Sequence, residues 1–227
     1  MSAKLLMDLE GIAFDPLPFT IKAVRRSLAR LGRPVSADTD LSFIAKQPIQ
    51  ATLDTLLPGE ERLHHRFLNL LRHHYCQQRW HTARLTPDIR ELLAGLGSGF
   101  RVQRVIVSAN PRATVACQLT DLGLVDRVDH VLYPEGSGCA HCRRRLVAQQ
   151  AQAADDSTLV WLTDLPSELE AAREISVLGV GALWGRLSEQ QLRETGDHAA
   201  ESPRALLASW SHVTVGSLNS ATPAGPR

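Results

Sequence analysis

The sequence has little cysteine, almost no net charge and no long apolar run. Four cysteines in 227 residues are too few and too unevenly spaced for the disulfide framework of a secreted protein. A net charge of +1 gives no general reason to expect binding to nucleic acid or to membranes. No apolar run approaches the roughly 20 residues that span a bilayer, and the N-terminus lacks a signal-peptide pattern. We therefore expect a cytoplasmic protein that binds neither nucleic acid nor membranes.

What the sequence does contain is typical of a globular protein. Apolar residues make up 44% and charged residues 22% of the chain, and its length permits one domain or two with a full core. Residues 19–79 repeat apolar side chains at three- and four-residue steps, which predicts an all-helical unit. Four later apolar runs alternate with helical segments and predict parallel strands, at residues 104–108, 128–133, 158–164 and 175–183.

A first apolar run, residues 5–8, precedes the helical unit. The unit is therefore predicted to be inserted between the first and second strands of one sheet. Alternating strands and helices favour the α/β class, here a Rossmann-like core of three layers with helices on both faces of a parallel sheet. We assign residues 1–16 and 83–215 to this core and residues 17–82 to the inserted all-helical unit. Residues 216–227 are small, polar and proline-containing, so we expect a flexible tail.

Polar side chains follow three of the predicted strands. Asp8 ends the first strand and Glu10 lies two residues on, Ser108 ends the second strand, and Asp164 ends the fourth. Because parallel sheets bind ligands beyond the carboxyl ends of their strands, these residues are candidates for a common site. Two converging carboxylates suit Mg²⁺, and a carboxylate also serves as a nucleophile toward phosphorus. The alternative is turn chemistry, with Ser108 and Asp164 starting the helices that follow them.

Three segments carry a resemblance to a known family. They are DLEGIAFD (residues 8–15), VIVSANPRATVACQLTDLGL (105–124) and LTDLPSELEAAREISVLGVGALWG (162–185). In their order and form they resemble motifs of the haloacid dehalogenase superfamily, in the phosphoglycolate phosphatase-like branch that carries an inserted helical cap. The resemblance spans residue 5 to about residue 215, and the third segment is its most specific part.

The resemblance implies a magnesium-dependent phosphatase of a small phosphorylated metabolite. It implies that Asp8 attacks phosphorus to form an aspartyl-phosphate and that Glu10 acts as general acid and base. Ser108, with Ala109 and Asn110, would hold the phosphoryl oxygens. The metal ligands implied are the carboxylates of Asp8 and Asp164 and the carbonyl of Glu10, with Glu168 a further candidate.

The sequence departs from the family pattern at several of these positions. Glu10 stands where the family has aspartate, and its extra methylene moves the carboxyl group by about 1 Å, an error that can cost roughly a hundredfold in rate. Ile12 replaces a threonine, Thr163 a glycine, and Glu168 an aspartate.

The lysine of the family's third motif is also missing, since residues 133–150 contain no lysine. Loss of one electrostatic contact to the transition state typically costs about 3 to 4 kcal/mol. One interpretation is that activity is weak or absent. The other is that Arg143, Arg144 or Arg145 binds the phosphate in its place, because the arginine fork matches phosphate oxygens well.

The same region contains the motif CAHC, from Cys139 to Cys142. With His141 it offers at most three of the four ligands of a structural zinc site, and no second pair follows. A reversible disulfide beside the phosphate site is a second hypothesis, and a pair of ordinary loop thiols is a third.

Two functions remain open from the sequence. The first is the phosphatase just described. The second is a catalytically impaired relative that keeps the fold to bind a ligand or a protein partner. The available metal ligands favour the first, whereas the missing lysine, Glu10 and Ile12 favour the second.

Overall fold

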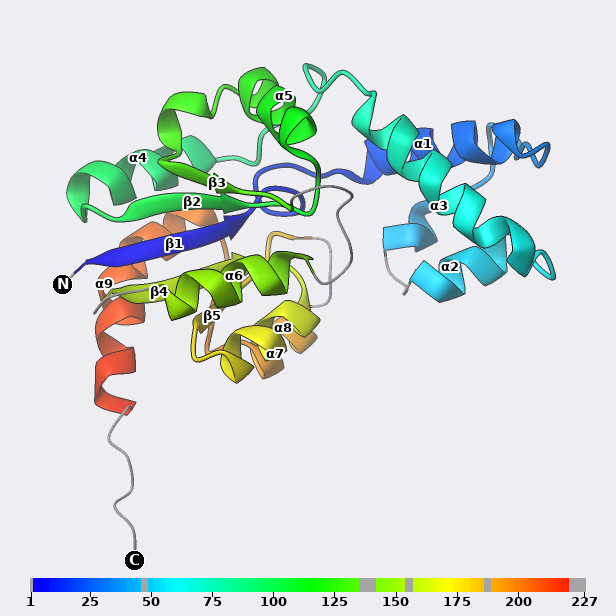
Figure 1. The fold of residues 1–227 in the computed structure, drawn as a ribbon. Helices are drawn as coiled ribbons and strands as arrows, with labels where there is room; N and C mark the ends of the chain where they lie inside the picture. The colour runs from blue at the N-terminus through cyan, green and yellow to red at the C-terminus, as the bar shows by residue number, and fades with distance from the viewer. Residues whose placement is uncertain (1, 46–48, 135–141, 154–156, 186–188, 221–227) are drawn as a thin grey trace, which may run out of the picture.

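The computed structural model describes residues 2–45, 49–134, 142–153, 157–185 and 189–220, arranged as shown in Figure 1. Its strands form a single sheet and are β1 (Ala3–Asp8), β2 (Gln103–Val107), β3 (His130–Leu132), β4 (Thr158–Thr163), β5 (Leu178–Ala182) and β6 (His198–Ala200). Their order is β3-β2-β1-β4-β5-β6, and every neighbouring pair is parallel. The predicted parallel α/β core is confirmed, and β1 lies at its centre between β2 and β4.

Helices cover both faces of the sheet (Figure 1). They are α4 (Ile89–Gly99), α5 (Arg112–Leu122), α6 (Cys142–Gln152), α7 (Pro166–Glu174), α8 (Glu189–Thr195) and α9 (Pro203–Ser220). Leu5 and Met7 of β1 belong to the larger apolar cluster, with side chains of α4, α5 and α9. Leu6 belongs to a second cluster, with Val147 of α6 and side chains of α7. Because side chains alternate along a strand, Asp8 is directed toward the same face as Leu6.

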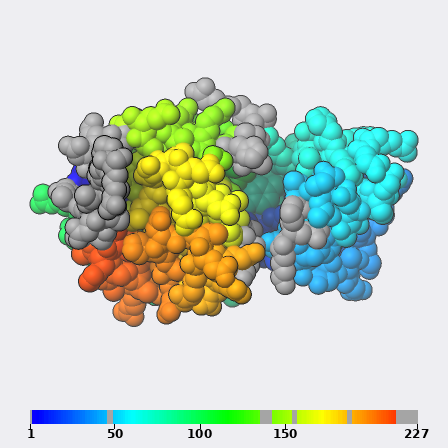
Figure 2. All heavy atoms as spheres, turned by 90° about the horizontal axis from the view of Figure 1, so that it is seen from below, coloured from blue at the N-terminus to red at the C-terminus, as the bar shows by residue number. Residues whose placement is uncertain are grey.

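The inserted residues form an all-helical unit, as predicted. It contains α1 (Leu17–Arg30), a short 3₁₀ helix η1 (Ser42–Ala45), α2 (Ile49–Leu56) and α3 (Glu61–Cys76). Leu28, Leu53 and Phe67, one from each α-helix, pack in an apolar cluster of the unit's own. Figure 2 shows the unit as a lobe beside the sheet and its helices. The two connecting segments pair with each other, since Thr86 N donates to the carbonyl oxygen of Ala13 at 2.7 Å.

Two parts of the fold differ from the sequence prediction. Strand β6 was not predicted, because a run of three residues is too short to show the alternation of apolar and polar side chains that marks a strand. It forms by pairing with β5. Helix α9 runs to Ser220, so residues 216–220, expected in a flexible tail, are helical. A helix already nucleated upstream, where Trp210 and Val213 are buried, extends at little cost per residue. The rest of the expected tail, residues 221–227, lies outside the described residues.

Of the helices that the structure describes, none has the length and apolar character needed to cross a membrane.

Candidate active site

Asp8 is fully buried at the end of β1, and both of its carboxylate oxygens accept hydrogen bonds from β4. Trp161 Nε1 donates to Oδ1 at 3.0 Å, and Thr163 Oγ donates to Oδ2 at 2.6 Å. The side chains reach Asp8 because β4 is the neighbour of β1, with Met7 opposite Leu162. Residues 161 and 163 of β4 therefore lie on the same face as Asp8. The carboxylate is fixed in position by two donors.

Thr163 also lies beside Glu168, which is in the first turn of α7. The Thr163 hydroxyl oxygen is 2.8 Å from Glu168 Oε2 as well as 2.6 Å from Asp8 Oδ2. A hydroxyl has one hydrogen, so it donates to only one of the two acids. Burial and the nearby charge of Asp8 raise the pKa of Glu168 well above its ordinary value, more than Arg143 lowers it.

Arg143, on the first turn of α6, supplies positive charge to these acids. Its Nη1 lies 3.9 Å from Asp8 Oδ2, and its Nε lies 2.7 Å from Glu168 Oε1. The side chain is only 17% exposed. Burial works against its charged form, but the carboxylates of Asp8 and Glu168, with Glu10 and Asp164 beyond them, leave the pKa of Arg143 raised. Arg143 is therefore a half-buried permanent cation beside Asp8 and Glu168.

Glu10 accepts hydrogen bonds from three side chains, one of α5 and two of the turn between β2 and α5. The donors are Gln118 Nε2 at 3.0 Å, Ser108 Oγ at 3.3 Å, and Asn110 Nδ2. Ser108 Oγ in turn accepts the backbone N–H of Asn110 at 3.1 Å, the turn contact that the alternative interpretation of Ser108 expects. Burial raises the pKa of Glu10 above its ordinary value, although Arg143 and the bond from Gln118 oppose this.

Asp164 is buried beside two glycines, at a distance that only glycine permits. A Cβ added to Gly11 would lie 2.5 Å from either Asp164 carboxylate oxygen, and one added to Gly185 would overlap the Asp164 side chain. Gly11 also has φ of +90°, a conformation that side chains disfavour. Next to Gly185, Trp184 Nε1 donates to the carbonyl oxygen of Ile12 at 3.2 Å. The glycines thus bring the loop after β1 against the end of β4.

The turn after β4 tests the alternative role of Asp164 as the start of α7. Leu165, rather than Asp164, occupies the N-cap position of α7. The backbone N–H of Leu165 donates to Thr163 Oγ at 3.2 Å, so the side chain that supports this turn is Thr163.

The predicted magnesium ligands suit a small site that is completed by water. In the part of the chain that the structure describes, no three acidic, histidine or cysteine side chains are grouped to enclose a metal ion. The predicted ligands are the carboxylates of Asp8 and Asp164 and the carbonyl of Glu10, and Glu168 stays a further candidate. Mg²⁺ usually takes one or two protein carboxylates and keeps several waters. The hydrogen bonds from β4 still leave one lone pair on each Asp8 oxygen, so the donor set fits the ion.

Some of the sequence-predicted residues lie elsewhere. Arg144 forms an ion pair with Glu174 at the surface, and Arg145 is exposed, so the structure brings neither to the acids. Ala109 is half-buried between Ser108 and Asn110, and its role stays a prediction. Cys142 is buried at the start of α6. Cys139 and His141 lie outside the described residues, so the predictions for the CAHC motif stay open.

Two side chains of the site were missed in the sequence, Gln118 and Trp161. Gln118 is fully buried and occupies a helix position three residues after the buried Val115. A glutamine on the apolar face of a helix was the available signal, because buried polar groups need partners. Trp161 offered a weaker signal, since an indole within a buried strand is ordinary core except for its N–H donor.

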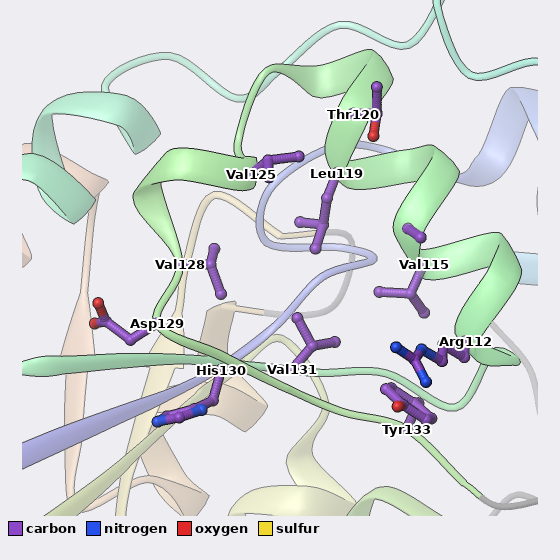
Figure 3. A pocket seen from close by; sticks show the side chains of 11 residues that line it. Arg112, Val115, Leu119, Thr120, Val125, Val128, Asp129, His130, Val131 and Tyr133 are labelled. Atoms are coloured by element: carbon purple, nitrogen blue, oxygen red, sulfur yellow. The ribbon is translucent and has the colours of Figure 1, made fainter.

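A separate concavity lies at the edge of the sheet (Figure 3). It has a volume of about 450 Å³ and is lined by α5, η2 (Val125–Arg127) and the segment around β3. Val115, Leu119 and Val131 face one another across it, while Arg112 lies over the ring of Tyr133, with 5.8 Å from Cζ to the ring centroid. Another concavity, of about 500 Å³ between α6 and α7, is lined in part by Arg143 and Glu168. Of its lining residues, Arg143 lies 3.9 Å from Asp8 Oδ2 and Glu168 lies 2.8 Å from the Thr163 hydroxyl oxygen.

Comparison with known proteins supports the fold. No protein-family model matches the sequence, and no curated protein is significantly similar to it. Among solved structures, a haloacid dehalogenase-like hydrolase from Streptococcus pneumoniae superimposes with a TM-score of 0.76 at 19% identity, covering 92% of this chain and 98% of the other. A predicted phosphatase from Clostridium acetobutylicum superimposes with a TM-score of 0.77 at 17% identity, covering 93% of this chain and 99% of the other.

A predicted phosphoglycolate phosphatase from Haemophilus somnus gives a TM-score of 0.73 at 15% identity, covering 92% of this chain and 98% of the other. Each of these matches spans almost the whole of both chains, so the helical unit and the sheet are shared together. This chain has the fold of the haloacid dehalogenase-like hydrolases.

Proposed function

We propose that this protein is a magnesium-dependent phosphatase of a small phosphorylated metabolite. The observation that carries the proposal is the position of Arg143, whose guanidinium lies 3.9 Å from Asp8 Oδ2 in a buried setting. The sequence left this cation in doubt because the family's lysine is missing. The printed names of the structural neighbours, a predicted phosphatase and a predicted phosphoglycolate phosphatase among them, support the same reaction class.

In the proposed reaction Asp8 is the nucleophile. Its carboxylate forms a bond to phosphorus while the bond from phosphorus to the substrate oxygen breaks, and Glu10 gives its proton to that leaving oxygen. Glu10 then takes a proton from a water molecule that attacks the phosphorus. This second step releases inorganic phosphate and restores the Asp8 carboxylate. The raised pKa of Glu10 suits a group that must carry a proton in the first step.

Arg143 neutralises charge on the transferring phosphoryl group in this proposal. Its planar fork binds phosphate oxygens better than a point charge does, which suits it to replace a lysine. Glu168 and Asp8 hold the guanidinium in place, since both lie within 4.0 Å of it. The preorganised cation costs no rearrangement at the moment of reaction.

Asp8, Asp164 and the Glu10 carbonyl would hold Mg²⁺. The ion, when bound, supplies positive charge against the phosphoryl oxygens. Asp164 lies against the loop after β1, in the space that Gly11 and Gly185 leave open. The helical unit would cover the substrate and so select it, as inserted lids commonly do.

A panel of phosphomonoesters tests the proposal. The wild-type chain is assayed with Mg²⁺ against Asp8→Asn, with Asp126→Asn as the matched control because Asp126 is exposed on η2. We expect turnover in the wild type and in the control and none in Asp8→Asn. If no substrate gives turnover above Asp8→Asn, the alternative holds, in which the fold serves to bind a ligand or a protein partner.

A further inference from the structure

The carboxylate of Glu10 accepts hydrogen bonds from three side-chain donors that could also bind a phosphoryl group. Ser108 Oγ, Asn110 Nδ2 and Gln118 Nε2 all donate to it. All three donors are neutral, and Ser108 and Gln118 are fully buried. Such donors can bind a carboxylate or a phosphoryl group, because each has anionic oxygens that accept hydrogen bonds.

The donors are preorganised for an anion. Ser108 Oγ accepts the backbone N–H of Asn110, so its own hydrogen is directed to a different acceptor, which is Glu10. Gln118 Oε1 is buried and has no hydrogen-bond partner among the described residues. An ionised carboxylate cannot supply a hydrogen to that oxygen, whereas the hydroxyl of monohydrogen phosphate can. The set therefore satisfies a protonated phosphate more fully than it satisfies Glu10.

The backbone around Glu10 is fixed, so that only its side chain is able to leave. Gly11 N donates to the carbonyl oxygen of Phe14 at 2.9 Å, and Ala13 N donates to that of Leu9 at 3.0 Å. Trp184 holds the carbonyl of Ile12 on the same loop. Departure of the Glu10 carboxylate is thus a rotation about its side-chain bonds, which takes place without unfolding the loop.

We propose that Ser108, Asn110 and Gln118 form one anion cradle, that Glu10 is its resident anion, and that a phosphoryl group binds by displacing Glu10. The inference rests on the proposed function in naming the phosphoryl group as the incoming ligand. It adds Gln118 to the substrate-binding residues. Two anions on one set of donors repel each other, so occupancy by phosphate and by Glu10 is mutually exclusive. Once rotated away from these donors, which favour its ionised form, Glu10 takes up a proton from water and can then give it to the leaving oxygen.

Binding of inorganic phosphate to the full chain tests this inference, measured by isothermal titration calorimetry with and without Mg²⁺. The variants are Glu10→Ala and Glu10→Ala combined with Gln118→Leu. The matched control is Glu91→Ala, which removes an exposed negative charge from α4. We expect Glu10→Ala to bind phosphate about tenfold more tightly than the wild type or the control, since the donors no longer have a resident anion. Adding Gln118→Leu should remove most of that gain.

The inference is overturned if Glu10→Ala binds phosphate no more tightly than the wild type, or if Gln118→Leu leaves the gain intact. Thermal unfolding shows whether Glu10→Ala folds. If it does not, Glu10→Gln replaces it, because the amide keeps the volume without the charge; its affinity should rise about threefold, and an unchanged affinity refutes the cradle. Binding is independent of turnover. An active wild type with no gain in Glu10→Ala defeats the cradle alone, whereas a gain in an inactive protein supports the cradle and defeats the phosphatase.

Discussion

Arg143 places its Nη1 3.9 Å from Asp8 Oδ2, joining the start of α6 to the end of β1. The contact puts a permanent positive charge beside the proposed nucleophile in a buried setting. It also connects Asp8 with Glu168, whose Oε1 lies 2.7 Å from Arg143 Nε. The Arg143 guanidinium therefore forms ion pairs with both Asp8 and Glu168, and its removal should lower both the activity and the stability of the protein.

Replacing Arg143 with alanine tests its role directly. We expect kcat/KM to fall about a hundredfold to a thousandfold, because one preorganised contact to the transition state is lost. Unfolding should also become easier by about 3 kcal/mol, since the buried acids lose their partner. Steady-state kinetics and urea unfolding measure the two effects. Arg145→Ala is the matched control, as Arg145 is exposed on the same helix; equal losses in both variants would contradict the assignment.

Thr163 should stabilise the protein through its hydroxyl. Thr163→Val keeps the shape but removes the hydrogen bonds to Asp8 and Glu168, which leaves two buried acids closer to direct repulsion. We expect a loss of about 1–3 kcal/mol in the free energy of unfolding, measured in urea. Thr163→Ser keeps the hydroxyl and should lose much less. A serine variant as unstable as the valine variant would show that the methyl group, not the hydroxyl, matters.

Gly185 should tolerate no side chain. In Gly185→Ala the new Cβ overlaps Asp164, so we expect destabilisation of about 1–3 kcal/mol and displacement of that carboxylate. Gly99→Ala is the control, because a Cβ at Gly99 meets no atom within 4 Å. Thermal unfolding without Mg²⁺ measures the loss of stability, and the change on adding Mg²⁺ measures whether the Asp164 carboxylate is still in place. The stabilisation of the wild type by Mg²⁺ should persist in Gly99→Ala and be lost in Gly185→Ala; its survival in Gly185→Ala would count against Asp164 as a ligand.

An ion pair away from the site gives a prediction on pH. Arg104 Nη2 donates to Asp129 Oδ1 at 2.7 Å, and this hydrogen bond holds the pKa of Asp129 below its ordinary value. A lowered acid pKa stabilises the fold above the unfolded pKa of about 4, and the stabilisation is lost as the pH falls through the folded pKa. The pair is partly exposed, so we expect no more than about 1 kcal/mol. The free energy of unfolding in urea should be higher for the wild type than for Asp129→Asn at pH 7, and the two values should become equal in acid. A difference that stays constant with pH would refute this effect of the lowered Asp129 pKa.

The polar residues at the strand ends could be predicted from the sequence, because each of them comes at the end of a clear apolar run. Asp8 is the last residue of β1, Ser108 and Asp164 directly follow β2 and β4, and in a parallel sheet the carboxyl ends of neighbouring strands lie together. The helical unit could be predicted as well, since the segments that form α1 and α3 repeat apolar residues at three- and four-residue steps.

The choice among the three arginines could not be made from the sequence. Arg143, Arg144 and Arg145 are consecutive, so successive side chains leave the helix about 100° apart and only one of them faces the acids. Which one it is depends on how α6 packs, and in the structure Arg143 contacts Asp8 and Glu168. The donors Gln118 and Trp161 were missed for a related reason. Their partners are far away in sequence, and only the packing of α5 and the β1–β4 pairing brings them together.

The most direct measurement is the mass of the enzyme stopped by acid during turnover of a phosphomonoester with Mg²⁺. We predict one phosphoryl group on the peptide that contains Asp8, present in the wild type and absent in Asp8→Asn. Hydrolysis by the wild type with no phosphoryl group on that peptide, or with the group on another residue, would contradict the assignment of Asp8 as the nucleophile.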